Sequence, residues 1–338
     1  MLFALPQIAH GFRNLYMISI GISLFVAGGV LDAFTLNVLG PHAKRLYGRL
    51  RMWTALSWGA GTFAMGIIND HYGFGWNFVL YAAFAVIQLL AVGFSVDPTK
   101  RSKSDGAPLE NPQKEVLMKV LTHKHTIAFF VEIFVFAMGM GVIEKGLLFV
   151  FMIRDLKAST TLCGACVGVT VLFELPVFQY SEKILQTLGH DGIVSIAYCC
   201  YIVRVFGYTM LTPETKHWIL ALELLHGFTF AGFWIAAVEH TRALTPPGWS
   251  STMQSLLTGT YQCFGQGIGA IAGGFVMKHL GSAILYRSTA TMVTALLMYK
   301  IVIALFVPSM STTPTLVQAS FHEDVRDLEV SEKASTEL

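Results

Sequence analysis

LDAFTLNVLGPHAKRLYGRLRMWTALSWGAG, residues 31–61, is the stretch of sequence on which the fold depends. It contains a short basic loop at 44–51 with an apolar run on either side, and the two runs extend over about 14–38 and 52–69. A helix needs about 20 mainly apolar residues to cross a bilayer, and Lys and Arg concentrate in cytoplasmic loops. The stretch therefore predicts two transmembrane helices joined by a cytoplasmic turn.

The same pattern continues along the chain of 338 residues, of which 54% are hydrophobic and 13% are charged. An ordinary soluble domain carries about 25% charged residues, so this depletion indicates a protein surrounded mainly by lipid. Seven further runs are long enough to cross a bilayer: 77–95, 126–150, 162–181, 191–211, 217–238, 253–276 and 284–307. Because these runs lack the period-two alternation of barrel strands, the sequence predicts an all-α, polytopic transmembrane helix bundle with about nine spans.

The Lys and Arg residues outside the predicted spans are distributed unequally between the two sides of the membrane. One set of alternate loops, together with the C-terminal segment, contains 14 of them, whereas the other side contains 6. Since positive charge marks the cytoplasmic side, we expect an integral, multi-pass membrane protein with a cytoplasmic C-terminus. The odd number of spans then places the N-terminus on the opposite side.

Two polar segments divide the chain into parts. Residues 96–124 carry three prolines and several charges, which predicts a cytoplasmic linker. Residues 309–338 have no apolar face at their end, which predicts a disordered acidic cytoplasmic tail. The linker leaves a partial N-terminal bundle of three spans in 1–95 and a C-terminal six-helix bundle in 125–308.

Several ionisable side chains lie inside the predicted spans, where each costs roughly 3 kcal/mol to insert. They are Asp32, Glu132, Glu144, Glu174, Arg204, Glu223 and His226. For the two glutamates of run 126–150 we favour structural ion pairs or side chains that reach the interface. For Glu174, Arg204 and His226 we favour a polar cavity shared by several helices. We also expect Glu174 and Arg204 to face each other, because each is an isolated charge in its run.

Glycine and cysteine have mainly structural interpretations. Gly265, Gly269 and Gly273 recur at every fourth position of run 253–276, which permits a close approach between helices. The Cys163-x-x-Cys166 pair lacks the second pair that a zinc site needs. The sequence also has no phosphate-binding loop, no H-E-x-x-H motif and no nucleophilic serine elbow. We therefore expect neither an enzyme nor a metal or cofactor protein.

The stretch at 31–61 resembles the region around the fourth and fifth helices of the major facilitator superfamily. In its lactose permease and associated-domain branch, an acid closes one helix and a Y/F-G-R-x-R motif opens the next, as do Asp32 and residues 47–51 here. The stretch LLHGFTFAGFWIAAVEHTRALTPPGWSSTMQSLLTGTYQCFGQGIGAIAGGFVMKHLG, residues 224–281, is similar to the tenth and eleventh helices of that branch. Together the resemblance covers about 14–308.

The resemblance implies roles for individual residues. Asp32 corresponds to the substrate-binding acid, Arg51 to the arginine that holds the sugar, and Trp58 to the ring that stacks on it. Glu174 corresponds to the acid that couples substrate to proton, with Arg204 and His226 beside it. The substrate-binding candidates are therefore Asp32, Arg51, Trp58, Glu174, Arg204 and His226. The proton-coupling candidates are Glu174, Glu223, His226 and Glu144.

The sequence also departs from that pattern. The glutamate that serves the lactose protein as a proton site is replaced here by Thr229, and a family lysine is replaced by Glu223. The family has twelve helices built from three-helix units, whereas the nine runs match the fourth to the twelfth, so the first unit is expected to be missing. This leaves open whether Met1 is the true start or the chain is a shortened variant.

Two functions remain open at this point. The first is a secondary active transporter that moves a small polar solute, sugar- or nucleoside-like, by alternating access, with proton symport as the candidate coupling. Its partners are the solute, protons and the lipid bilayer. The net charge of +2 and the lack of a basic patch give no reason to expect a nucleic acid. The alternative is a non-transporting membrane protein of the same fold, either truncated or resembling a receptor or scaffold.

Overall fold

The computed structural model describes residues 44–95, 114–246 and 249–306, and all of its regular elements are helices. The elements of the N-terminal part and the linker are α3 (Lys44–Tyr72), α4 (Trp76–Ser95) and α5 (Lys114–Thr122). The elements that follow are α6 (Lys124–Glu144), α7 (Leu147–Arg154), α8 (Thr160–Gln179), α9 (Ser181–Tyr208), η3 (Lys216–Trp218), α10 (Ile219–Glu223), η4 (Gly227–Gly232), α11 (Phe233–Leu244), α12 (Ser250–Thr258), η5 (Gly259–Gly265), α13 (Gln266–Leu280) and α14 (Ser282–Phe306).

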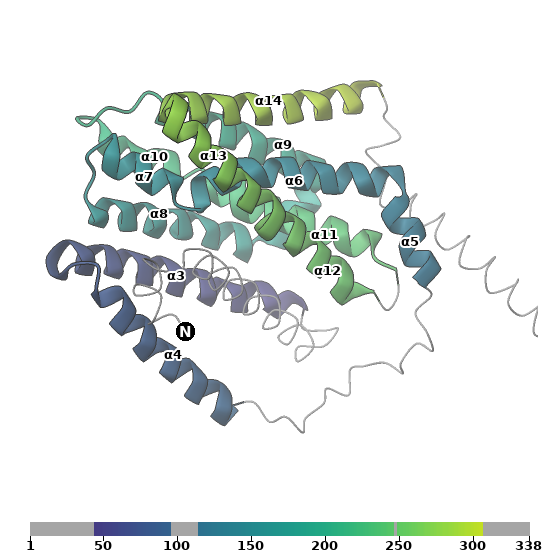
Figure 1. The fold of residues 1–338 in the computed structure, drawn as a ribbon. Coiled ribbons are helices and arrows are strands. Elements are labelled where there is room, and N and C mark those ends of the chain that lie inside the picture. The colour runs from purple at the N-terminus through teal and green to yellow at the C-terminus, as the bar shows by residue number, and fades with distance from the viewer. Residues whose placement is uncertain (1–43, 96–113, 247–248, 307–338) are drawn as a thin grey trace, which may run out of the picture.

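The helices from α6 onward form one bundle, and α3 lies along α8 on one side of it (Figure 1). The helix α4 contacts α3 and diverges from the bundle beyond it (Figure 1). The core of the bundle is apolar and aromatic, with Phe136, Tyr198, Tyr201 and Phe233 almost completely buried. The N-terminal part meets the C-terminal bundle along α3 and α8. This arrangement positions the cavity of the candidate site.

Eight of the nine predicted spans lie on helices that the structure describes, and run 14–38 lies outside the described residues. Among the described helices, four stretches are long and apolar enough to cross a membrane: Lys124–Arg154, Thr160–Gln179, Ser181–Tyr208 and Lys216–Leu244. These four coincide with the predicted runs from 126 to 238. For the other predicted spans, passage through the membrane stays a prediction.

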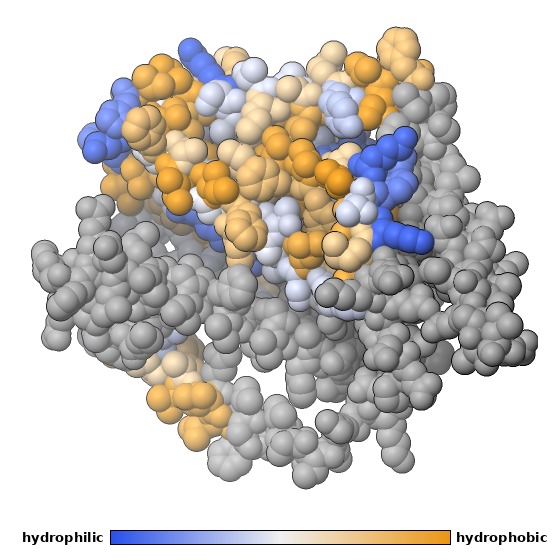
Figure 2. All heavy atoms as spheres, turned by 45° about the vertical axis from the view of Figure 1, so that its right-hand side comes forward, coloured by the Kyte–Doolittle hydropathy of each residue, from blue (hydrophilic) through white to orange (hydrophobic). Residues whose placement is uncertain are grey.

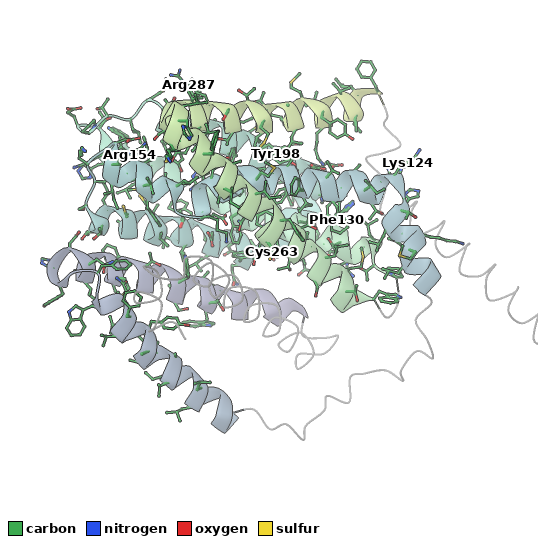
Figure 3. All side chains as sticks on the ribbon, viewed as in Figure 1. Lys124, Phe130, Arg154, Tyr198, Cys263 and Arg287 are labelled. Carbon is green, nitrogen blue, oxygen red and sulfur yellow. The ribbon has the colours of Figure 1, made fainter. Side chains whose placement is uncertain are left out.

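The surface of the bundle fits a lipid environment. Figure 2 shows apolar side chains across the middle of one face, with hydrophilic side chains gathered toward its two edges. In Figure 3, Arg154 and Arg287 lie toward one end of the bundle and Lys124 lies at the other. Lys124 ends the predicted cytoplasmic linker, whereas Arg154 and Arg287 follow an odd number of further predicted spans, so the alternation of loops expects them on the other side. The fold separates the two arginines from Lys124 in agreement with this expectation (Figure 3).

Two features were not anticipated. Within the predicted linker at 96–124, residues Lys114–Thr122 form the helix α5, while 96–113 lie outside the described residues. Three of the predicted spans are also not continuous α-helices. Run 126–150 is broken at Gly146, whose φ of 95° lies in the left-handed region that glycine tolerates. Runs 217–238 and 253–276 contain the π-helical turns η4 and η5, respectively, a geometry frequent at functional sites.

The glycine series Gly265, Gly269 and Gly273, at the end of η5 and in α13, packs closely against neighbouring helices, as predicted. A Cβ atom added at Gly265 would lie 3.0 Å from the carbonyl oxygen of Phe134. A Cβ at Gly269 would overlap the backbone of Met138, and one at Gly273 would lie 2.9 Å from side-chain atoms of Leu147 and Val142. The prediction of a helix–helix contact at Gly269 is thus confirmed, with α6 as the partner.

Candidate functional site

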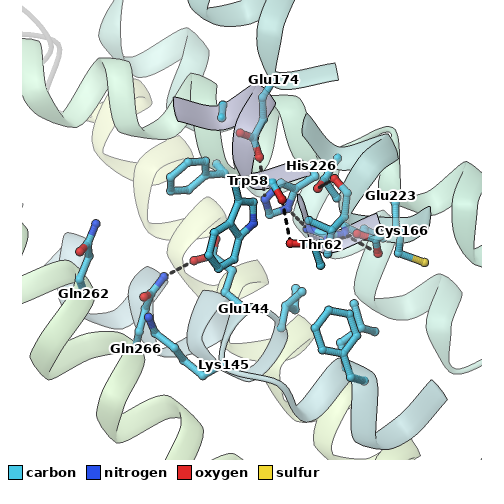
Figure 4. Close-up of a pocket in the computed structure, with 18 of the residues that line it drawn as sticks. Trp58, Thr62, Glu144, Lys145, Cys166, Glu174, Glu223, His226, Gln262 and Gln266 are labelled. Atoms are coloured by element: carbon cyan, nitrogen blue, oxygen red, sulfur yellow. Dashed lines mark hydrogen bonds and ion pairs between the residues drawn. The ribbon is translucent and has the colours of Figure 1, made fainter. Parts of the chain in front are cut away.

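A cavity of about 470 Å³ lies between α3 and the C-terminal bundle. Its lining comes from α3, α8 and α9 and from the three interrupted spans α6–α7, α10–η4 and η5–α13. Figure 4 shows the side chains that face it. All of the predicted site residues whose side chains the structure describes line it: Trp58, Glu144, Glu174, Arg204, Glu223 and His226. Side chains from α3, α6, α8, α9 and α10, together with His226 at the N-cap of η4, therefore converge on one space, as the cavity interpretation of the intramembrane charges requires.

Arg204 is the centre of the charged network in the cavity wall. Its Nη2 lies 2.5 Å from Oε2 of Glu223 and its Nε lies 3.3 Å from Oε1, so the two side chains form a bidentate pair. Tyr208 donates a hydrogen bond to the same carboxylate. Both charged side chains are only 1% exposed, so each depends on the other for its compensation.

His226 connects this pair to Glu174. Its Nδ1 lies 2.6 Å from Nη1 of Arg204, and its Nε2 lies 3.2 Å from Oε1 of Glu174. A guanidinium can only donate hydrogen bonds, so Nδ1 must be the acceptor and the ring proton must sit on Nε2, directed at Glu174. The geometry therefore defines a continuous chain from Glu223 through Arg204 and His226 to Glu174.

This arrangement corrects the predicted pairing of Glu174 with Arg204. Among the described contacts, the acid that pairs with Arg204 is Glu223, and Glu174 lies against His226 instead. The physical reason is that Glu223 and His226 are three residues apart and share one face. Both side chains bind the Arg204 guanidinium from the segment α10–η4, which packs against α9.

Glu144 stands at the break between α6 and α7. Gln266, at the start of α13, donates a hydrogen bond from Nε2 to Oε2 of Glu144. The other carboxylate oxygen, Oε1, is buried and has no hydrogen-bond partner within the described part of the chain. A carboxylate has about four acceptor positions, so this side chain has capacity left for a proton or for a donor group of a bound molecule.

Trp58 provides an aromatic surface in the same cavity. Figure 4 shows it between Glu174 and His226 on one side and the Glu144–Gln266 pair on the other. The residue is 68% exposed, so its ring is free to contact a solute. Asp32 lies outside the described residues, and Arg51 lies on α3 but its side chain is not among those described.

Sequence reasoning missed several residues that line the cavity. The amides of Gln262 and Gln266 enter from η5 and α13, and Thr62 and Thr170 contribute hydroxyl groups from α3 and α8. The two glutamines are four residues apart in an otherwise apolar run, and this spacing was an available signal for a polar helix face. Phe149, Phe178 and Phe230 add aromatic wall area.

Glu132 belongs to a separate cluster outside the cavity lining. Lys300 of α14 lies 3.2 Å from Glu132 and 2.7 Å from Asp191 of α9. Tyr198 also donates a hydrogen bond of 2.7 Å to Glu132. The structural ion-pair interpretation therefore holds for Glu132, whereas Glu144 belongs to the cavity.

The described residues do not contain a group of three or more His, Cys, Asp or Glu side chains that could hold a metal ion. Cys163 and Cys166 are both buried free thiols near the start of α8. What the cavity offers is a set of hydrogen-bonding and charged groups beside aromatic rings. Such a set can bind and orient a small polar molecule.

Comparison with known proteins gives a family match over residues 2–288, to the MFS_1 like family. The chain is 26% identical over 180 residues to Major facilitator superfamily domain-containing protein 6-like protein A of Xenopus laevis, covering 53% of this chain and 29% of that protein. It is 24% identical over 135 residues to Major facilitator superfamily domain-containing protein 6-like of Mus musculus, covering 40% and 23%.

A bacterial relative matches over a longer stretch. The chain is 20% identical over 243 residues to the Uncharacterized transporter YwbF of Bacillus subtilis (strain 168), covering 71% of this chain and 58% of that protein. In each of these three comparisons the matched region covers less than two thirds of the relative.

Proposed function

The chain belongs to the MFS_1 like family, and on that premise we propose that it is a secondary transporter for a small polar, sugar- or nucleoside-like solute. Membership makes it an integral, multi-pass membrane protein of a transporter family rather than an enzyme. It also agrees with the resemblance of 31–61 and 224–281 to the major facilitator superfamily. In the proposed mechanism, the N-terminal part and the C-terminal bundle rock about the cavity and expose it to each side in turn.

The observation that carries this proposal is the convergence of intramembrane charges on one cavity. Arg204, Glu223, His226 and Glu174 form a chain of contacts along its wall, and Glu144 lines the same cavity. Charged groups inside a membrane are costly and usually mark a pathway for a solute or an ion. Here they share one space beside Trp58, which offers an aromatic face to the apolar side of a ring.

We assign solute recognition to a wall formed by Asp32, Arg51 and Trp58. Arg51 and Trp58 are seven residues apart on α3, hence about two turns apart on one helix face. An arginine fork and a carboxylate together can bind neighbouring hydroxyl groups. Arg204 and His226 complete the site from the C-terminal bundle.

We assign coupling to protons, with Glu174, Glu223, His226 and Glu144 as the candidate groups. Glu174 accepts a hydrogen bond from the Nε2–H group of His226. A proton added at this carboxylate would therefore change the row of contacts that runs from Glu174 through His226 to Arg204. Glu144 retains an unpartnered oxygen that faces the same cavity. Proton binding at either acid would therefore alter the charge that a solute meets. We further propose that the 96–124 linker and the C-terminal tail lie in the cytoplasm.

Solute binding by the purified protein tests the recognition wall. In a panel of sugars and nucleosides, a solute at 100 times its Kd should stabilise the wild type by about 2.7 kcal/mol in thermal unfolding. Trp58→Leu should weaken its affinity by about two- to ten-fold, because stacking on the ring is lost. Arg51→Lys should weaken it as well, because lysine keeps the charge but loses the bidentate geometry.

Trp53→Leu is the matched control for this experiment. Trp53 is an exposed tryptophan on the same helix that does not line the cavity, so its loss should leave the affinity unchanged. If Trp58→Leu and Arg51→Lys both bind the solute with wild-type affinity, the recognition wall is wrong. Arg51 would then be a positive anchor at the membrane interface and Trp58 an interface aromatic.

A further inference from the structure

The N-terminal part of the chain meets the C-terminal bundle along a seam between α3 and α8, by far the largest contact that α3 makes among the described helices. Glycines bring the two helices into backbone contact. A Cβ atom added at Gly66 would lie 2.7 Å from the carbonyl oxygen of Thr160, and one at Gly164 would lie 2.9 Å from that of Thr62. The two helices therefore touch without intervening side chains at these points.

Asp70 closes one end of this seam. Its Oδ1 accepts hydrogen bonds from the backbone N–H of Thr160 at 3.1 Å and from the Thr160 hydroxyl at 2.5 Å. Its Oδ2 accepts the corresponding bonds from Thr161 at 2.7 Å and 2.5 Å. A single carboxylate on α3 thus fills four acceptor positions with donors from the first two residues of α8.

These contacts complete the N-terminus of α8. The first N–H groups of a helix have no partner inside that helix. Ser159, the N-cap residue, accepts the N–H of Leu162 through its side chain at 3.2 Å, but the preceding two N–H groups bind Asp70. A negative charge at this position also interacts favourably with the helix dipole. The α8 terminus therefore depends on a residue of the other half of the molecule.

The hydrogen bonds from the Thr160 and Thr161 side chains lower the pKa of Asp70 below its usual range. Asp70 lies just beyond the predicted span 52–69, and its carboxylate is ionised at neutral pH. The contact is therefore present in its charged form under ordinary conditions.

We propose that Asp70 is a latch that holds the two halves of the molecule together at one end of the cavity, and that it must release before the cavity can open there. This inference rests on the proposed alternating access, because rocking of the halves separates α3 from α8. The cavity begins close by, since Thr62 lines it and lies eight residues, or about 12 Å, before Asp70. By the loop charges, this end is the non-cytoplasmic one.

Asp70→Asn removes the carboxylate charge and keeps the size and shape of the side chain. An amide presents one acceptor oxygen and an NH2 group that faces the donors of Thr161 or Thr160, and it carries no charge for the helix dipole. Because charge-assisted hydrogen bonds are the stronger ones, we expect the fraction of molecules open at this end to rise about tenfold. The double change Thr160→Val with Thr161→Val removes only the hydroxyl donors and should give a smaller rise.

The test measures the distance between spin labels at residues 72 and 218, in protein whose cysteines at 199, 200 and 263 are replaced by serine. Tyr72 and Trp218 are exposed and lie on opposite sides of the seam. The wild type should show one short distance in lipid nanodiscs, and Asp70→Asn should add a longer one. Since no solute is used, the result is independent of whether uptake is ever observed.

Asp155→Asn is the matched control. Asp155 is also hydrogen-bonded, to Arg154 at 2.7 Å and to Ser282, but both partners belong to the C-terminal bundle. The distance distribution of the Asp155→Asn variant should therefore remain that of the wild type. The latch is refuted if Asp70→Asn gives the wild-type distribution, or if Asp155→Asn broadens it equally. Should Asp70→Asn fail to fold, the double threonine variant decides, and a wild-type distribution in that variant also refutes the latch.

Discussion

Replacing Arg204 with methionine should destabilise the protein by roughly 3–5 kcal/mol, the largest loss that we expect from a single substitution. Glu223 would then keep a buried negative charge without its bidentate partner. Glu223→Gln should be costly for the reciprocal reason, because the guanidinium would lose its carboxylate. The double variant should be less damaging than the two single losses added together, since it removes both charges at once.

A double-mutant cycle, measured as unfolding free energies in detergent, tests this pair. We expect a coupling energy toward the upper part of the usual range of about 0.5–3 kcal/mol. Arg242 and Glu239 form the control pair, because they also make an Arg–Glu contact but are about half exposed. An exposed pair contributes about 0–1 kcal/mol. Strictly additive losses at Arg204 and Glu223 would show that the cavity wall is not held by this interaction.

Gly269→Leu should cost about 3 kcal/mol or more, because the added side chain has no room. A Cβ atom at Gly269 already overlaps the carbonyl group of Met138 on α6. Backbone atoms cannot rotate away as a side chain can, so α13 would have to separate from α6. Since Gln266 and Glu144 meet across the same contact, the cavity would be distorted as well.

Gly267→Leu provides the comparison within the same helix. A Cβ atom at Gly267 meets no atom within 4 Å, so this variant should keep the folded yield and the melting temperature of the wild type. Gly269→Leu should lose most of the folded yield after purification. If the two variants behave alike, glycine in α13 matters only for helix propensity and not for the close approach to α6.

The residue types of the site could be predicted from the sequence because a charge inside an apolar run has a clear physical meaning. Glu174, Arg204, Glu223 and His226 were identified by that cost alone, and the structure brings them to one cavity. Their pairing was not predictable in the same way. The position of a charge along its run does not give the rotation of its helix about the helix axis. The sequence therefore led to Glu174 as the partner of Arg204, whereas the structure pairs Arg204 with Glu223.

The irregular helices also escaped sequence reasoning. A count of apolar residues does not separate a continuous helix from one broken at Gly146 or from one with a π-helical turn such as η5. Both irregularities lie beside the cavity, and the hydrogen bond between Glu144 and Gln266 joins them. Lys300 was overlooked for a related reason, because a single lysine in a long apolar run hardly changes the mean hydropathy of the run. It forms ion pairs with Glu132 and Asp191.

Uptake of a labelled solute into sealed vesicles that contain the purified protein tests the transport function most directly. We predict that a solute bound by the cavity accumulates inside the vesicles under an imposed pH gradient, and that Trp58→Leu reduces this uptake while Trp53→Leu does not. A solute that binds with the predicted dependence on Trp58, yet enters no faster than in protein-free vesicles, would contradict transport. It would identify the chain as a non-transporting receptor or scaffold of the same fold.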